Sequence, residues 1–159
     1  DGWGIAPDSD GNALTRAKAK VADYAFTTLD PNLGSLYGFI LADIPGLIEG
    51  ASEGKGLGHR FLKHIRRTRV LLHCISLEGE GLLETYDVVR GELGKYDAEL
   101  ARKEEMVILT KTDTRTPHEI AAAVKLFEKR GCAVMSVSIL DEASLKRLSE
   151  ALAARLSVK

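Results

Sequence analysis

Short apolar runs alternate with helical stripes along most of this chain, and that alternation limits the fold more than any other feature. Four runs with the length and composition of buried strands lie at residues 35–44, 70–77, 106–110 and 133–139. Apolar residues recur at helical steps in four further stretches, at 57–65, 82–100, 120–127 and 145–152. The pattern predicts an α/β fold with a mainly parallel sheet and helices on both faces, whose ligands bind at the carboxyl ends of the strands.

The remaining segments are predicted to be connections. Residues 1–12 are rich in Gly, Asp and Pro and lack periodicity, so we expect an irregular N-terminal tail. Residues 13–20 could form a short helix, and residues 21–34 are expected to be a long loop. A chain of 159 residues suits one domain, which we place at residues 13–159.

The composition excludes several classes of protein. The chain carries 22 basic and 23 acidic residues, so it has no global basic field and any contact with RNA must be local. Cys74 and Cys132 lack metal-ligand spacing, which favours buried thiols in a reducing compartment. No apolar run approaches the roughly 18 residues of a membrane span, and the first residues do not have the pattern of a signal peptide. We therefore expect a cytoplasmic location.

The sequence Asp-Ile-Pro-Gly at residues 43–46 directly follows the first apolar run. An aspartate at the carboxyl end of a strand can hold Mg²⁺ through water, and a glycine three residues later can offer its N–H to a terminal phosphate. An ordinary turn after a strand has the same pattern and is the commoner case.

A second polar tetrapeptide, Thr110-Lys111-Thr112-Asp113, follows the apolar run at 106–110. The carboxylate of Asp113 could accept hydrogen bonds from guanine N1–H and the exocyclic amine, while the stem of Lys111 lies along the base. A polar turn after a strand explains the tetrapeptide alone about equally well. Its position downstream of Asp43-Ile44-Pro45-Gly46 favours recognition of guanine.

Two longer segments, LTRAKAKVADYAFTTLDPNLG at 14–34 and DIPGLIEGASEGKGLGHRFLKHIRRTR at 43–69, strongly resemble Obg-type GTPases. The resemblance implies a three-layer fold like that of P-loop GTPases, with switch I in the first segment and switch II in the second. It also implies GTP or GDP as ligand, Mg²⁺ as cofactor, slow Mg²⁺-dependent hydrolysis of GTP, and a role in assembly of the large ribosomal subunit.

Carried over residue by residue, the resemblance assigns Thr28 and Asp43 to the metal and names no catalytic residue. Leu47 stands where Ras-like enzymes have a water-orienting glutamine, which implies slow hydrolysis. Ser138 is matched by counting back from the helical Leu145, and a serine that merely ends a strand explains it as well. The implied nucleotide-binding residues are Phe26, Thr27, Thr28, Leu29, Asp43, Ile44, Pro45, Gly46, Thr110, Lys111, Thr112, Asp113, Ser138, Ile139 and Leu140.

One element that the resemblance calls for is not found. A phosphate-binding loop, G-x-x-x-x-G-K-[ST], should lie just before residues 12–15, where the chain reads GWGIAPDSDG. Gly54-Lys55 lies inside the switch II segment and is followed by Gly56. We therefore expect the first strand and this loop to be missing or degenerate, GTP binding by this exact chain to be poor, and the domain to come from a longer protein.

Two other functions stay open at this point. The chain could be a degenerate, non-catalytic GTPase-fold module that docks on ribosomal RNA or protein, or an α/β domain with an unrelated ligand. The basic run at residues 59–69 is either a solvated helix face, the more usual case, or a contact with RNA phosphates.

Overall fold

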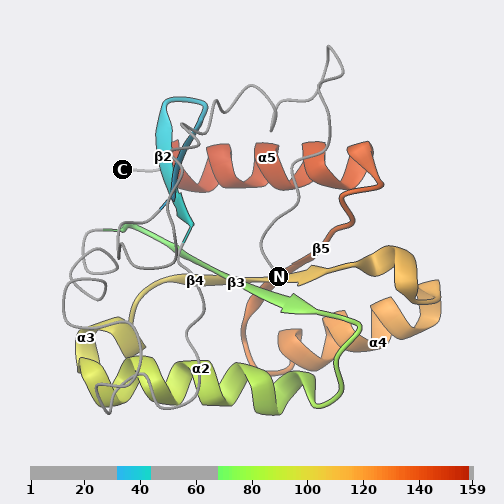
Figure 1. The fold of residues 1–159 in the computed structure, drawn as a ribbon, viewed down its shortest axis with the longest axis horizontal. Coiled ribbons are helices and arrows are strands. Elements are labelled where there is room, and N and C mark those ends of the chain that lie inside the picture. Colours follow the sequence, from blue (N-terminus) through green and yellow to red (C-terminus); the bar gives the residue numbers. More distant parts are fainter. Residues whose placement is uncertain (1–31, 44–67, 158–159) are drawn as a thin grey trace.

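The computed structural model describes residues 32–43 and 68–157, which form two sheets and the helices that cover one of them (Figure 1). Strands β1 (Asn32–Leu36) and β2 (Phe39–Asp43) make an antiparallel hairpin. Strands β3 (Leu71–Ser76), β4 (Glu105–Thr110) and β5 (Ala133–Ser136) make a parallel sheet in that order. The helices are α2 (Leu82–Tyr96), α3 (Ala98–Ala101), α4 (Pro117–Glu128) and α5 (Glu142–Ser157), with a 3₁₀ turn, η2, at Thr112–Thr114.

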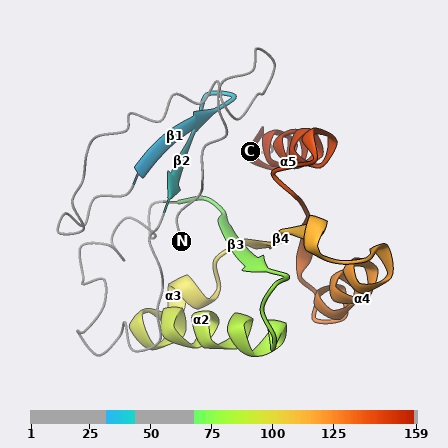
Figure 2. The same ribbon diagram turned by 45° about the vertical axis from the view of Figure 1, so that its right-hand side comes forward.

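Strand β4 divides the apolar core into two halves. Val107 and Leu109 point to one face, where they pack with residues of α2 and α4, including Phe127. Met106 and Ile108 point to the other face, where they pack with Leu152 of α5. Figures 1 and 2 show α5 on one side of the sheet and α2, α3 and α4 on the other. The predicted α/β fold with helices on both faces is thereby confirmed.

Local signals explain where the helices begin and end. Thr116 caps α4 by accepting a hydrogen bond from the Glu119 N–H at 3.4 Å, and the Glu119 carboxylate accepts one from the Thr116 N–H at 2.8 Å. Pro117 supplies the first helical residue, where no N–H is needed. The apolar stripe at 82–100 was predicted as one helix, but the extended backbone of Asp97 ends α2, and its carboxylate caps α3.

The expectation of a single strand at residues 35–44 is wrong. The run forms parts of both hairpin strands, joined by a turn at Tyr37 and Gly38, whose φ angles are 49° and 82°. Positive φ at both central residues is the geometry of a type I′ turn, which matches the twist of a hairpin. Residues 32–34, expected in a loop, therefore belong to β1. The stripe at 57–65 and residues 1–31 lie outside the described residues.

Across residues 32–43 and 68–157, none of the helices combines the length and the apolar character that crossing a membrane requires.

Candidate functional site

The carboxyl ends of β4 and β5 bring two of the sequence-predicted segments together. Parallel pairing places Leu109 beside Ser136, and the Val137 N–H donates to the Leu109 carbonyl at 2.8 Å. One step further, the Thr112 N–H donates to the Val137 carbonyl at 3.3 Å. Residues 110–113 and 138–140 are therefore neighbours at the edge of the sheet where α/β proteins bind ligands.

Asp113 and Ser138, 25 residues apart in the chain, are in direct contact. The Ser138 hydroxyl donates to Oδ1 of Asp113 and accepts from the Leu140 N–H at 3.1 Å. Ser138 is 2% exposed, whereas the Asp113 side chain is exposed. A buried serine thus holds an exposed carboxylate, which keeps lone pairs available for donors on a ligand.

Lys111 adopts the left-handed conformation, with φ at 59°, although it is not a glycine. This conformation costs a residue with a Cβ about 1–2 kcal/mol, and such strain gathers at functional positions. The Lys111 ammonium pairs with the Glu78 carboxylate, which comes from the loop after β3. Both side chains are about half exposed, so the ion pair adds little stability.

Thr110 ties the same edge to β3. Its carbonyl accepts a hydrogen bond from the Leu77 N–H at 3.1 Å, and its hydroxyl lies 3.4 Å from the Ile75 carbonyl oxygen. Arg115, just beyond η2, donates through Nε to the Leu77 carbonyl at 2.8 Å. These bonds brace the loop between β4 and α4 against the loop after β3.

Asp43 stands apart from this group. It ends β2 with an exposed side chain, and no contact within residues 32–43 and 68–157 joins it to Asp113 or Ser138. Its carboxylate lies close enough to Cys74 on β3 to act on the thiol. The other predicted switch residues lie outside the described residues: Phe26, Thr27, Thr28, Leu29, Ile44, Pro45 and Gly46.

The expectation of two buried thiols is wrong for Cys74, which is exposed on β3, an outer strand of the sheet in the described part of the chain, while Cys132 is half-buried. Although solvent reaches Cys74, desolvation by the surrounding protein, with a smaller contribution from the Asp43 carboxylate, raises the pKa of its thiol to about 11. Both causes disfavour the thiolate.

Alkylation of Cys74 by iodoacetamide should therefore be slow at pH 8 and should rise about tenfold per pH unit until pH approaches 11, because the thiolate is the nucleophile. Mass spectrometry of alkylated peptides measures the rate at Cys74 separately from that at Cys132. Asp43→Asn should shift the profile to lower pH, since it removes a negative charge. A Cys74 profile centred near 8.5 would contradict the described surroundings of this thiol.

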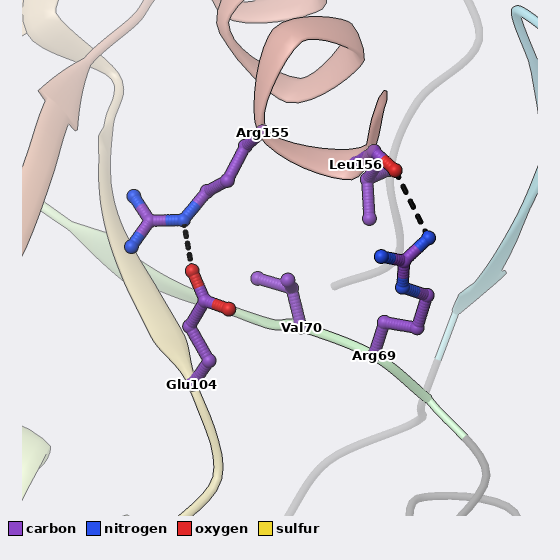
Figure 3. A pocket seen from close by; sticks show the side chains of 5 residues that line it. All are labelled: Arg69, Val70, Glu104, Arg155 and Leu156. Atoms are coloured by element: carbon purple, nitrogen blue, oxygen red, sulfur yellow. Dashed lines mark hydrogen bonds and ion pairs between the residues drawn. The ribbon is translucent and has the colours of Figure 1, made fainter. Parts of the chain in front are cut away.

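A cavity of about 350 Å³ lies at the opposite edge of the sheet (Figure 3). It is lined by Arg69, Val70, Glu104, Arg155 and Leu156, which precede β3 and β4 or end α5. Arg155 Nε lies 2.5 Å from Glu104 Oε1, and Arg69 donates to the Leu156 carbonyl at 3.0 Å. Both arginines thus tie the last turn of α5 to the sheet, and the cavity is separate from the Asp113 site.

Two residues near Asp113 were not predicted from the sequence. Glu78 pairs with Lys111, and Ser144 of α5 accepts a hydrogen bond from the Ser138 N–H at 3.2 Å. Neither belongs to a recognisable motif. Only the packing of the loop after β3 and of the first turn of α5 brings them to this edge.

Comparison with known proteins adds an independent finding. The family described as "50S ribosome-binding GTPase" matches residues 11–111. "GTPase Obg" of Pelagibacter ubique (strain HTCC1062) is 44% identical over 150 residues, which cover 91% of this chain and 46% of that protein. "GTPase Obg" of Brachyspira hyodysenteriae (strain ATCC 49526 / WA1) is 51% identical over 121 residues, covering 73% of this chain and 18% of that protein. The chain thus spans less than half the length of either relative.

Proposed function

This chain belongs to the 50S ribosome-binding GTPase family and is of the Obg type, and from that premise we propose that the edge formed by β4 and β5 binds the base of a guanine nucleotide. The contact that carries the proposal is the one between Ser138 and Asp113. It presents a carboxylate to solvent, and guanine offers that carboxylate two donors, N1–H and the exocyclic amine. Adenine has an acceptor at N1 and lacks the amine at C2.

The reaction that we propose for the whole protein is hydrolysis of GTP to GDP and phosphate with Mg²⁺. Asp43 fits the role of a metal residue, since its exposed carboxylate ends a strand, and Thr28 would complete the pair. When bound, Mg²⁺ neutralises the charge that develops on the transferred phosphoryl group. Phe26, Thr27, Leu29, Ile44, Pro45 and Gly46 would be further nucleotide-binding residues. With Leu47 next to Gly46, no side chain there can orient the attacking water, so hydrolysis is expected to be slow.

Hydrolysis of GTP also requires residues that bind its phosphates. The 159 residues contain no G-x-x-x-x-G-K-[ST] segment, so the function that we assign to this chain itself is recognition of guanine. Because the chain belongs to a GTPase family, the alternative function, a docking module that binds no nucleotide, is not favoured. We place the GTP-binding domain at residues 13–159.

The partner that we propose is the large ribosomal subunit, in line with the description of the family. The basic run at residues 59–69 is the segment of this chain whose charge suits RNA phosphates. Within residues 68–157, the basic residue of that run is Arg69, and one of its guanidinium nitrogens donates to the Leu156 carbonyl at 3.0 Å.

Asp113→Ala should remove the preference for guanine. Each lost charge-assisted hydrogen bond is worth about 1.5–3 kcal/mol, so GTP should bind no better than ATP. Stability should fall by no more than about 1–3 kcal/mol, because the Asp113 side chain is exposed and the main loss is the acceptor of the buried Ser138 hydroxyl. Titration of both nucleotides followed by NMR measures the preference, and Glu150→Ala, which removes one exposed carboxylate from α5, is the matched control. An unchanged preference for GTP in Asp113→Ala would refute the assignment.

A further inference from the structure

A buried serine in the first turn of α5 holds the backbone of Ser138. Ser144 is 3% exposed, and its Oγ accepts a hydrogen bond from the Ser138 N–H at 3.2 Å. The same hydroxyl lies 2.7 Å from the Asp141 carbonyl oxygen and 3.2 Å from the Ser138 carbonyl oxygen, so these two acceptors share its one proton. Ser144 therefore contacts both the amide and the carbonyl group of Ser138.

The contact of Ser144 with the Ser138 N–H, together with the Asp141 N–H, which donates to the Ser138 carbonyl at 3.1 Å, sets the direction of the next N–H group. The Ser138 carbonyl and the Ile139 N–H belong to one planar trans peptide, so they point in opposite directions. Because the carbonyl points to Ser144 in α5, the Ile139 N–H points away from that helix. Within the described part of the chain nothing accepts a hydrogen bond from this N–H, and the Ile139 side chain is 57% exposed. The N–H is thus available to an acceptor on a ligand.

Ser138 connects this N–H to the carboxylate of the site. Its hydroxyl donates to Asp113 Oδ1, and its backbone is held by Ser144. One residue therefore fixes a donor, the Ile139 N–H, and an acceptor, the Asp113 carboxylate, relative to each other. Guanine carries the complementary pair, with the O6 acceptor beside the N1–H donor, whereas adenine has an amine donor in place of O6.

We propose that Ser144 is a positioning residue for guanine recognition, which holds the Ile139 N–H in the orientation that meets O6. The inference rests on the proposed function, because it takes Asp113 as the residue that binds the base. A peptide held in place before the ligand arrives does not have to be ordered during binding. Without the Ser144 hydroxyl, the peptide between Ser138 and Ile139 has to be ordered when the ligand binds, which weakens binding. The contact with O6 is weakened, and the contact with Asp113 is not.

Three nucleotides separate these contacts in the purified 159-residue chain. GMP offers O6, N1–H and the exocyclic amine, IMP lacks only the amine, and AMP has an amine in place of O6. In Ser144→Ala, the Kd values of GMP and IMP should both rise by about 3- to 10-fold, with the ratio between them and the Kd of AMP unchanged. Asp113→Ala, in contrast, should abolish the difference between GMP and IMP. NMR titration is suited to weak binding of this kind.

The matched control is Ser149→Ala, which removes a second buried hydroxyl from α5. Ser149 is 2% exposed, and its hydroxyl donates to the Leu145 carbonyl at 2.9 Å, away from Ser138. It should leave all three Kd values unchanged. Thermal unfolding confirms that each variant is folded, and Ser144→Cys, which fills the same space with a much weaker hydrogen-bonding group, replaces Ser144→Ala if the alanine variant does not fold.

Unchanged Kd values for GMP and IMP in a folded Ser144 variant would refute the role of Ser144. An equal rise of these Kd values in Ser149→Ala would also refute it. Neither result would refute the proposed function. A wild-type chain that binds GMP no better than AMP would refute the proposed function as well. The two failures are therefore distinguishable.

Discussion

Replacing Phe127 by alanine is expected to lower the free energy of unfolding by about 3–5 kcal/mol, the usual cost of removing a fully buried phenyl ring. Phe127 is 0% exposed and packs in the core half that includes Val107 and Leu109. Its ring also meets that of Tyr86 edge to face, with centroids 5.7 Å apart and planes at 74°. The substitution therefore loses apolar burial and an aromatic contact and leaves a cavity between α4, α2 and the sheet.

The loss should be visible as a lower midpoint in urea at an unchanged slope. Domains of this size are stable by only about 5–15 kcal/mol, so the variant could approach the limit of folding at 37 °C. Leu126→Ala is the control, because Leu126 neighbours Phe127 in α4 but is 38% exposed, and it should cost clearly less. Equal losses in the two variants would contradict the described packing of α4.

The second expected result is that the 159-residue chain binds GTP with at best millimolar affinity, about −4 kcal/mol. The proposed contacts of Asp113 and Ile139 with the base would supply a few hydrogen bonds, and most of their free energy would only offset the entropy lost on association. No G-x-x-x-x-G-K-[ST] segment is present to surround the phosphates with N–H groups and a lysine. Mg²⁺ should add little, since the hydroxyl of that segment would normally bind it.

Calorimetry with GTP and with GMP tests this result. The two Kd values should agree within about threefold, because phosphates that remain in water contribute little to binding. The same comparison with and without Mg²⁺ should show no change. A micromolar Kd for GTP, well below that for GMP, would demonstrate that the 159 residues hold a phosphate site of another form.

Some parts of the candidate site were predictable because their signals are local. Asp113 follows a run of apolar residues in a tetrapeptide of polar ones, and a strand end at the edge of a parallel sheet is where ligands bind. The start of α4 has a similarly local cause, since Thr116, Pro117 and Glu119 lie within four residues. Both signals involve only residues that are near neighbours in the chain.

Other parts depended on contacts between distant segments. The apolar run at 35–44 has the composition of one strand, and only the turn at Tyr37 and Gly38 shows that it is divided between two. Ser144 belongs to no motif. The role that we propose for it depends on where α5 begins relative to Ser138, and α5 packs on β4 through Leu152.

What the sequence determined by itself was the class of fold, the alternation of strands and helices after residue 70 and the resemblance to Obg-type GTPases, because periodicity and motifs depend on residues that are close together in the chain. Only the tertiary structure decided that Val107 and Leu109 pack against α4 while Met106 and Ile108 pack against α5. It also decided that Ser138 holds Asp113. Those choices depend on shape complementarity and on buried polar groups finding partners across the fold, and residues far apart in the chain satisfy these conditions only together.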